Sequence, residues 1–229
     1  MISLGAQLGE TIEYAGVLMP SLLKGAFESL KLFICTLLFS IPLGLPITLG
    51  RISRIPPLRW LCKLYILLFR GTPLMLQLFF FYYALAIAMD IKLSIFAAAT
   101  LTFTLNYAAY FAEIYRGGIE SIDKGQHEAA YSLGLSKSQT MIGIILPQTV
   151  KRVLPAISNE AIVLVKDTAL ASVIGMYELM KVSYGILNRD TSAIALLIAA
   201  VIYLSFTAIL TVLSGYLERR YSRHENRED

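Results

Sequence analysis

Apolar stretches long enough to cross a lipid bilayer take up most of this 229-residue chain, and they constrain its fold more than any other feature. A helix needs about 20 mostly apolar residues to span the hydrocarbon core. Five such stretches are predicted, at about residues 22–50, 61–89, 93–116, 155–177 and 193–217. Because 56% of the residues are hydrophobic and only 16% are charged, little sequence remains for a water-soluble domain. We therefore predict an all-α integral membrane protein, with five transmembrane helices in a single domain over residues 1–229.

The distribution of Lys and Arg predicts the side of the membrane on which each connecting segment lies. Thirteen basic residues fall in one set of segments: Arg51, Arg54, Arg59, Lys63, Arg116, Lys124, Lys137, Lys151, Arg152, Arg219, Arg220, Arg223 and Arg227. The other set holds five: Lys24, Lys31, Lys92, Lys181 and Arg189. Cytoplasmic loops carry the excess of Lys and Arg. We therefore expect an extracytoplasmic lead-in at residues 1–20, a cytoplasmic loop at residues 120–147 and a cytoplasmic tail at residues 218–229.

The longest polar loop, residues 123–147, reads as two helices joined by a sharp turn. Asp123 with Gln126 forms a variant of the capping box, and Ser136 with Gln139 forms a regular one. Gly134 lies between them, where the end of a helix favours a residue that tolerates positive φ. Pro147 lacks the N–H that a helix needs, so we expect the second helix to end or kink there.

The same loop contains the pattern EAA-x3-G-x9-I-x-LP, from Glu128-Ala129-Ala130 through Gly134 to Leu146-Pro147. It resembles the EAA loop of type I ABC importer permeases. That resemblance implies a coupling helix that docks on a separate ATP-binding subunit through four residues: Glu128, Ala129, Ala130 and Gly134. A DNA-binding helix-turn-helix is the alternative for such a segment. The apolar stretches on both sides argue against it, so no nucleic acid is expected as a partner.

Polar residues inside the apolar stretches are the candidate substrate contacts, since ionisable groups at membrane depth are costly and usually functional. Arg70 and Lys166 lie roughly 14–17 Å deep when counted at 1.5 Å per residue, about halfway through the core. Asn106, Tyr110 and Glu113 are spaced i, i+4, i+7, so they share one face of a helix. Gln77 follows Arg70 by seven residues, and the same face is expected for both.

Two of the stretches contain sequences that interrupt a helix, at residues 70–73 and 166–168. Interrupted helices expose backbone groups that suit a zwitterionic ligand. The predicted substrate contacts are Arg70, Gln77, Asn106, Tyr110, Glu113, Lys166 and Asp167. Arg70 or Lys166 would bind the carboxylate of an α-amino acid, and Glu113 or Asp167 its ammonium group. In the alternative, these charges pair with one another, and the amide and the phenol join neighbouring helices.

Further segments, within residues 70–77, 106–118 and 166–170, resemble the polar amino acid subfamily of these permeases. The resemblance implies an ATP-driven importer in the bacterial inner membrane that works by alternating access. Its partners would be ABC ATP-binding subunits, a second permease subunit (a copy or a paralogue), an extracytoplasmic amino-acid-binding protein and the lipid bilayer. No G-x4-G-K-[ST] pattern occurs in the chain, so ATP binding and hydrolysis are assigned to the partner.

Neither catalysis nor a metal is predicted for this subunit. Cys35, Cys62, His127 and His224 show no metal-ligand spacing, and no cofactor is expected. The alternatives are a stand-alone carrier or channel for small zwitterions driven by an ion gradient, and an ABC permease for another small solute such as methionine. An intramembrane enzyme would have only a pair of carboxylates to work with.

Overall fold

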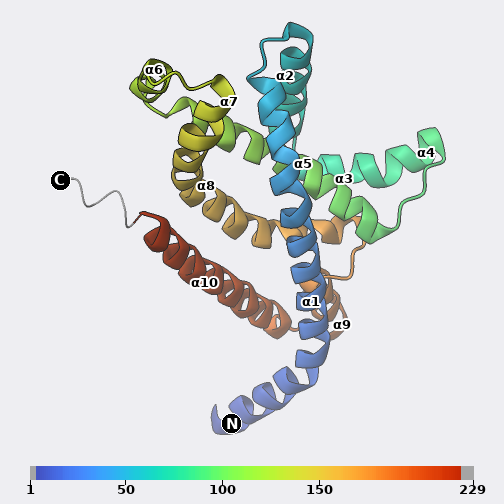
Figure 1. The fold of residues 1–229 in the computed structure, drawn as a ribbon. Helices are drawn as coiled ribbons and strands as arrows, with labels where there is room; N and C mark the ends of the chain where they lie inside the picture. Colours follow the sequence, from blue (N-terminus) through green and yellow to red (C-terminus); the bar gives the residue numbers. More distant parts are fainter. Residues whose placement is uncertain (1–3, 223–229) are drawn as a thin grey trace. The chain divides into compact units, whose positions relative to one another are not determined.

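The computed structural model describes residues 4–222, and within that range it is helical apart from short connections (Figure 1). Two segments, η1 and η2, are π-helical, and η3 is a 3-10 helix. In chain order the elements are α1 (Leu4–Arg51), α2 (Pro56–Gly71), α3 (Leu74–Phe79), η1 (Phe80–Ala84), α4 (Leu85–Met89), α5 (Ile95–Glu120), α6 (Lys124–Ser132), α7 (Lys137–Thr140), η2 (Met141–Ile145), α8 (Leu146–Asp167), η3 (Thr168–Ile174), α9 (Leu179–Asp190) and α10 (Ile194–Ser222).

Three helices among the described residues are long and apolar enough to cross a membrane: Gly9–Arg51 of α1, Ile95–Glu120 of α5 and Ile194–Tyr221 of α10. The broken pair Pro56–Gly71 and Leu74–Met89 makes a fourth if it counts as one span. The stretch predicted as another span, residues 155–177, falls on α8 and η3, where charged residues interrupt the apolar sequence. The helical membrane fold is confirmed, and a count of five spans stays a prediction.

Helix boundaries differ from the expected ones at the N-terminus. The described part of the lead-in belongs to the same 48-residue helix as the first span, so no separate segment precedes that span from Leu4 onward. The two expected interruptions are confirmed. Helix α2 ends at Gly71 with Thr72 in an extended conformation, and α8 gives way to a 3-10 helix at Thr168.

The described residues form two compact units. Among the described residues, unit 1 comprises residues 4–36, 74–102 and 163–209, and unit 2 comprises residues 37–73, 103–162 and 210–222. In unit 1, α1, α9 and α10 bury a cluster of apolar side chains: Leu18, Leu22, Ala26, Leu179, Val182, Ile186, Ala195 and Ala199. Gly25 permits the close approach of α9, since a Cβ there would lie 3.0 Å from the Leu179 Cα.

In unit 2, α1 and α5 cross at small residues. A Cβ on Gly44 would lie 3.0 Å from the Phe111 Cβ and 3.3 Å from the Ala112 backbone nitrogen. Such small-residue contacts let membrane helices pack backbone to backbone. The Thr48 hydroxyl lies within hydrogen-bonding distance of the Gly44 and Ala112 carbonyl oxygens, at 2.8 and 3.0 Å, and ties the crossing together.

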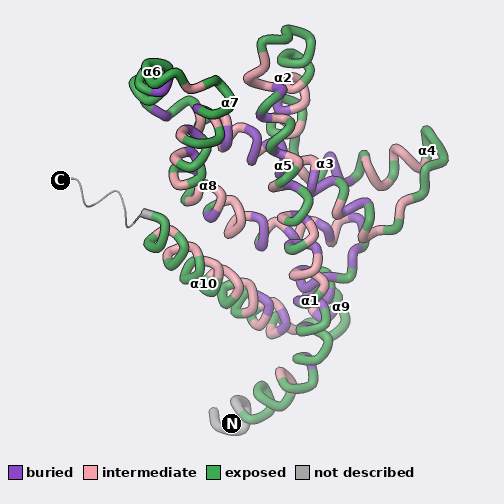
Figure 2. The backbone as a smooth tube through the Cα atoms, viewed as in Figure 1, coloured by how far each residue is buried: buried purple, intermediate pink, exposed green. Residues whose placement is uncertain are grey.

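Burial differs sharply between the apolar helices (Figure 2). In the most apolar 18-residue stretch of α5, 61% of the residues are buried within the chain, whereas in that of α10 only 6% are buried. Since α10 covers little of its apolar surface with protein, that surface is available to lipid or to another membrane subunit.

Candidate coupling surface and substrate contacts

The elbow, defined as residues 123–147, begins with a helix cap. Asp123 is the N-cap of α6, and its carboxylate accepts a 2.6 Å hydrogen bond from the Gly125 N–H. The predicted cap is confirmed, but Gln126 does not complete a box with it. The Gln126 side-chain oxygen instead accepts a 3.1 Å hydrogen bond from Gln148 of α8. The start of α6 is thereby linked to α8.

Gly134 makes the bend of the elbow. It adopts φ +74°, a left-handed conformation that favours glycine. The Gly134 N–H donates to the Tyr131 carbonyl at 2.9 Å, and the Leu135 N–H donates to the Ala130 carbonyl at 3.1 Å. These two bonds form a Schellman motif, which satisfies the last carbonyls of α6.

The second helix of the elbow starts at the predicted capping box. The Gln139 N–H donates to the Ser136 hydroxyl at 3.3 Å, and the Ser136 N–H donates to the Gln139 side-chain oxygen at 2.9 Å. The box and the Schellman motif use only neighbouring residues. The helix–turn–helix shape is therefore encoded within the elbow itself.

Pro147 does not end the helix, contrary to one of the two predicted outcomes. Residues Met141–Ile145 widen into a π-turn, in which the Leu146 N–H donates to the Met141 carbonyl five residues earlier. The chain then continues through Pro147 as α8. A wider turn reassigns the hydrogen bonds around the missing proline N–H, so the helix survives with a local change of register.

Most of the predicted docking residues of the elbow are exposed to solvent. Glu128, Ala129 and Gly134 are exposed, and only Ala130 of the four predicted docking residues is buried, since it packs inward. Two large side chains beside them, Tyr131 and Leu133, are 83% and 78% exposed. Apolar side chains of this size on a protruding turn are typical of a surface that another protein covers.

A hollow of about 370 Å³ lies beside this face. Its rim includes three basic residues (Arg54, His127 and Lys137), and Tyr131 and Met141 line its apolar part. The segment that leads into the elbow is bonded to the helix that follows it, since Arg152 of α8 donates to the Ser121 carbonyl just after the end of α5. The elbow therefore rests on packed helices rather than on a free loop.

Asn106, a predicted substrate contact, joins two helices. Its side-chain amide donates a 2.8 Å hydrogen bond to the Phe69 carbonyl of α2. That carbonyl lies four residues before Pro73, which has no N–H to give it. Asn106 is also 4% exposed, so the structure favours the helix-joining role for this residue.

Arg70 lies at the last turn of α2 and is exposed. The central carbon of its guanidinium group lies 5.0 Å from the centroid of the Tyr110 ring, within the range of a cation–π contact. Arg70 and Tyr110 are thus brought together, and their contact with a substrate stays a prediction. The shared helix face predicted for Arg70 and Gln77 is wrong, because α2 ends at Gly71 and a new helix begins at Leu74.

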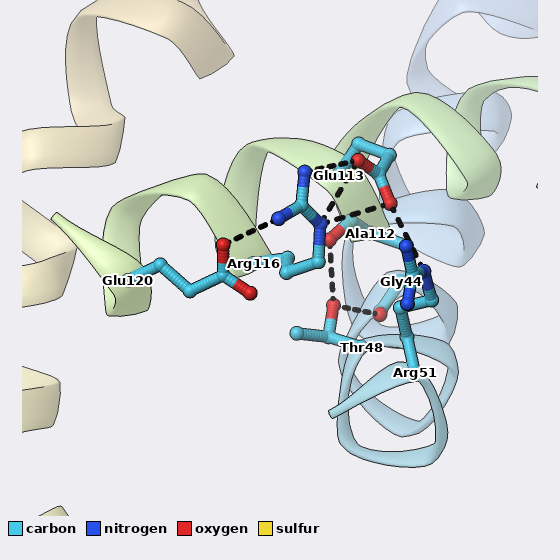
Figure 3. Close-up of polar contacts among 7 residues, drawn as sticks. All are labelled: Gly44, Thr48, Arg51, Ala112, Glu113, Arg116 and Glu120. Atoms are coloured by element: carbon cyan, nitrogen blue, oxygen red, sulfur yellow. Dashed lines mark hydrogen bonds and ion pairs between the residues drawn. The ribbon is translucent and has the colours of Figure 1, made fainter. Parts of the chain in front are cut away.

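Glu113 is held by two arginines (Figure 3). Its carboxylate accepts bonds of 2.6 to 3.1 Å from Arg116, and its Oε1 lies 3.7 Å from the Arg51 Nε. Arg116 also pairs with Glu120 at 2.5 Å. Because both oxygens of Glu113 are engaged, an incoming ammonium group would have to compete with these guanidinium groups.

The remaining predicted contacts belong to unit 1. Gln77 is buried on α3, with 8% of its surface exposed. Lys166 is exposed and Asp167 is half-buried at the end of α8. The Thr168 hydroxyl donates to the Val165 carbonyl at 2.7 Å, so it bonds the backbone at the point where the helix changes to 3-10 geometry. Lys166 and Asp167 thus stand at a true helix interruption.

Sequence reasoning missed Glu178, which is completely buried. It caps α9, accepting from the N–H groups of Met180 and Lys181 at 2.8 and 2.6 Å, and its Oε2 lies 3.1 Å from the Tyr203 hydroxyl. Ser29 of α1 approaches the same oxygen at 3.4 Å. Burial raises the pKa of the Glu178 carboxyl, whereas these hydrogen bonds lower it, and the effect of burial is the larger one. Glutamate is not a preferred N-cap residue, so the sequence carried no cue to this cluster.

Among the described residues no group of three His, Cys, Asp or Glu side chains is placed to hold a metal. Cys35 and Cys62 are free thiols. His224 lies outside the described residues.

Comparison with known proteins places the chain. Residues 18–223 match the family described as binding-protein-dependent transport system inner membrane component. The chain is 36% identical to the arginine transport system permease protein ArtQ of Bacillus subtilis (strain 168), over 90% of this chain and 95% of that protein. It is 38% identical to the L-cystine transport system permease protein TcyB of the same organism, over 90% and 88% of the two chains.

Solved structures agree with this placement. A chain of an amino acid ABC transporter crystallised with histidines superposes with a TM-score of 0.85 at 34% identity, covering 92% of this chain and 97% of that one. The MetNI methionine ABC transporter in an inward-facing conformation gives 0.73 at 18% identity, covering 89% and 97%, and so shares the fold. A family match over nearly the whole chain, with relatives above 30% identity, establishes that this protein belongs to the binding-protein-dependent transport system inner membrane components, the multi-pass permease subunits of ABC importers.

Proposed function

We propose that the chain is the permease subunit of an ATP-driven importer of polar amino acids. The observation that carries the proposal is the elbow, a self-contained helix–turn–helix with Glu128 and Ala129 exposed and large apolar side chains beside them. The names of the relatives at 36% and 38% identity, arginine and L-cystine permeases, support the class of substrate. The subunit itself is not an enzyme, and ATP is bound and hydrolysed by its partner.

The elbow is the docking surface for the ATP-binding subunit. Glu128 pairs with a basic group of that subunit, since an exposed carboxylate gains little from solvent-exposed pairs within its own chain. Tyr131 and Leu133 supply the apolar contact area that a stable interface needs. The exposed apolar surface of α10 is available to lipid and to a second permease subunit, a copy or a paralogue.

The Lys and Arg residues within residues 51–63 and 116–152 support a topology with the N-terminus outside and the C-terminus in the cytoplasm. An extracytoplasmic amino-acid-binding protein delivers the substrate from the outer side. The bilayer is that of the bacterial inner membrane. ATP binding moves the docked elbow, and the movement is passed to α5 and α8, which hold its two ends.

Substrate contact is proposed for the predicted residues that remain accessible. Arg70 and Lys166 are exposed cations that suit the carboxylate of an amino acid, and Asp167 suits its ammonium group. Gln77, Tyr110 and Glu113 stay predictions of the same kind, and Glu113 acts only if its arginine pairs open. For Asn106 the hydrogen bond to Phe69 favours a structural role.

The proposal is tested in proteoliposomes that contain the complete transporter and its binding protein. Glu128→Lys is expected to leave ATP hydrolysis running while uptake of L-arginine or L-cystine falls by about tenfold or more, because the docking charge is reversed. Glu13→Lys makes the same charge change at an exposed position of α1 and is expected to leave uptake unchanged. Uptake that needs no ATP would instead identify an ion-driven carrier, and undiminished uptake by Glu128→Lys would remove the docking role.

A further inference from the structure

A second hollow, of about 400 Å³, lies within unit 1. Helix α1 contributes Lys24 and Glu28 to it, and α5 contributes Ile95 and Phe96. The connection between η3 and α9 adds Met176 and Tyr177. We call this hollow the Lys24–Glu28 pocket. It combines one cation, one carboxylate and an apolar wall.

The two charges face the same hollow without neutralising each other. Lys24 and Glu28 are one helical turn apart, yet among the described ion pairs Glu28 is joined to Lys31, at 2.9 Å, and not to Lys24. The Lys24 ammonium lies 5.7 Å from the centroid of the Tyr177 ring. An ammonium group has three donors and a carboxylate about four acceptor positions. The Lys31 ammonium lies 3.1 and 2.9 Å from the two Glu28 oxygens, so each oxygen keeps one further acceptor position, and a ligand ammonium would share this carboxylate with Lys31.

The wall opposite these charges is held in place by the backbone. Gly175 adopts φ +86°, which turns the chain out of η3 and sets Met176 and Tyr177 beside the pocket. The next residue, Glu178, is anchored to α9 by two backbone N–H groups and to α10 through Tyr203. On α5, the Phe96 ring makes a cation–π contact with the Lys31 ammonium, which lies 5.0 Å from the ring centroid. The pocket is thus built from anchored parts.

The chemistry of the pocket fits a free α-amino acid. A zwitterionic α-amino acid carries a carboxylate and an ammonium group on the same carbon atom, and these match a cation and an anion one helical turn apart. Its side chain would lie on Phe96 and Met176. A volume of about 400 Å³ is at the small end of ligand pockets, which suits one amino acid and excludes a folded segment of another protein.

We propose that the Lys24–Glu28 pocket binds a zwitterionic amino acid, with the carboxylate on Lys24 and the ammonium group on Glu28. This inference rests on the proposed function, because the ligand is taken to be the transported substrate. With the N-terminal half of α1 on the outer side, the pocket receives the amino acid that the binding protein releases. It is separate from the predicted contacts Arg70, Lys166 and Asp167, none of which lines it.

The test measures binding to the complete permease–ATPase complex in lipid nanodiscs, without the binding protein. The probes are tritiated L-arginine and L-glutamine, each competed by its methyl ester and by its Nα-acetyl form. In the wild type, each blocked form should compete about tenfold less well, since it lacks one charge. Lys24→Gln should remove the discrimination against the ester alone, and Glu28→Gln the discrimination against the acetyl form alone.

Lys92→Gln is the matched control, because Lys92 is an exposed lysine of the same unit that pairs with Asp90 outside the pocket. It should behave as the wild type. Unchanged discrimination in both pocket variants, or no binding of either amino acid to the wild-type complex, overturns the inference. Loss of binding-protein association in the variants, with amino acid binding intact, would also overturn it and make the pocket a docking site.

ATP-driven uptake is measured in parallel with the binding protein present. A wild-type transporter that imports none of the polar amino acids overturns the proposed function. Normal wild-type import together with failure of the binding test overturns only the inference about the pocket.

Discussion

The side-chain amide of Asn106 donates a 2.8 Å hydrogen bond to the Phe69 carbonyl of α2, which lies four residues before Pro73. A proline removes the N–H that would have reached back four residues. In a membrane helix the freed carbonyl must find another donor, because no water is present to replace it. Asn106 on α5 supplies that donor. The break in α2 therefore explains why a polar residue is buried on α5.

Replacing this donor should destabilise the protein. Asn106→Leu is expected to lower the free energy of unfolding by about 1–2 kcal/mol, because it removes the buried hydrogen bond from the Asn106 amide to the Phe69 carbonyl. The measurement is denaturant-induced unfolding in detergent micelles. Asn188→Leu, at an exposed position of α9, is the control and should change little. Equal effects of the two substitutions would contradict the assigned role.

Arg116 binds two carboxylates that differ in burial, which makes a matched pair. The Glu113 side chain is 17% exposed and faces two arginines, whereas the Glu120 side chain is 55% exposed. Glu113→Gln should cost about 2 kcal/mol of unfolding free energy, because two half-buried guanidinium groups lose their counter-ion. Glu120→Gln should cost less than about 1 kcal/mol, as exposed pairs do. The free energy of unfolding is measured for the wild type and both variants at two salt concentrations. The contribution of the exposed Arg116–Glu120 pair should fall more at high salt than that of the Arg116–Glu113 pair.

The left-handed conformation of Gly134 makes the bend of the elbow sensitive to a single methyl group. Gly134→Ala should destabilise the bend by about 1 kcal/mol, because a Cβ is strained at φ +74°. Space is not the cause, since a Cβ there would meet nothing within 4 Å. The amount of amino acid imported per ATP hydrolysed should fall. Gly117→Ala, in a regular turn of α5 that is equally open, should leave that ratio intact.

Glu178 predicts a pH dependence with a definite sign. Burial raises its pKa above the ordinary 4.5, so the folded protein binds a proton that the unfolded chain has already released. Stability from this group is therefore fully present below pH 4.5 and is lost as the pH rises through the raised pKa. The check is the thermal stability of the wild type and of Glu178→Gln, measured from below pH 4.5 to above the raised pKa. The difference between them should change with pH, and a constant difference would exclude titration of Glu178.

The sequence predicted the parts of this protein that local rules determine. Apolar length located α1, α5 and α10, and cap residues located both helix starts of the elbow and its glycine bend. The breaks after Arg70 and at Asp167 followed from Gly, Pro and polar residues in apolar surroundings. These features depend on neighbours in the chain, so a sequence read alone contains them.

Features that depend on distant residues were not predictable in the same way. Helical spacing assigned Arg70 and Gln77 to one face, but spacing has no meaning across the break at Thr72. For Glu113 the sequence left open a ligand contact or an ion pair, and it could not show that Arg51 lies beside this carboxylate from another helix. The capping of α9 by Glu178 needs Ser29 and Tyr203 from remote segments. The π-turn before Pro147 lets the helix continue although this proline has no N–H to donate, whereas sequence rules predicted only a break or a kink there.

The hydrogen bonds that cap the two helices of the elbow and form its bend arise within residues 123–139, at Asp123, at Gly134 and between Ser136 and Gln139. The segment is therefore pre-organised, and a protein that grips it loses little conformational entropy in doing so. No refolding of the segment accompanies binding, because its shape is already present beforehand. In the proposed docking role, a segment whose shape is fixed in advance passes on a movement of its partner instead of absorbing it by bending.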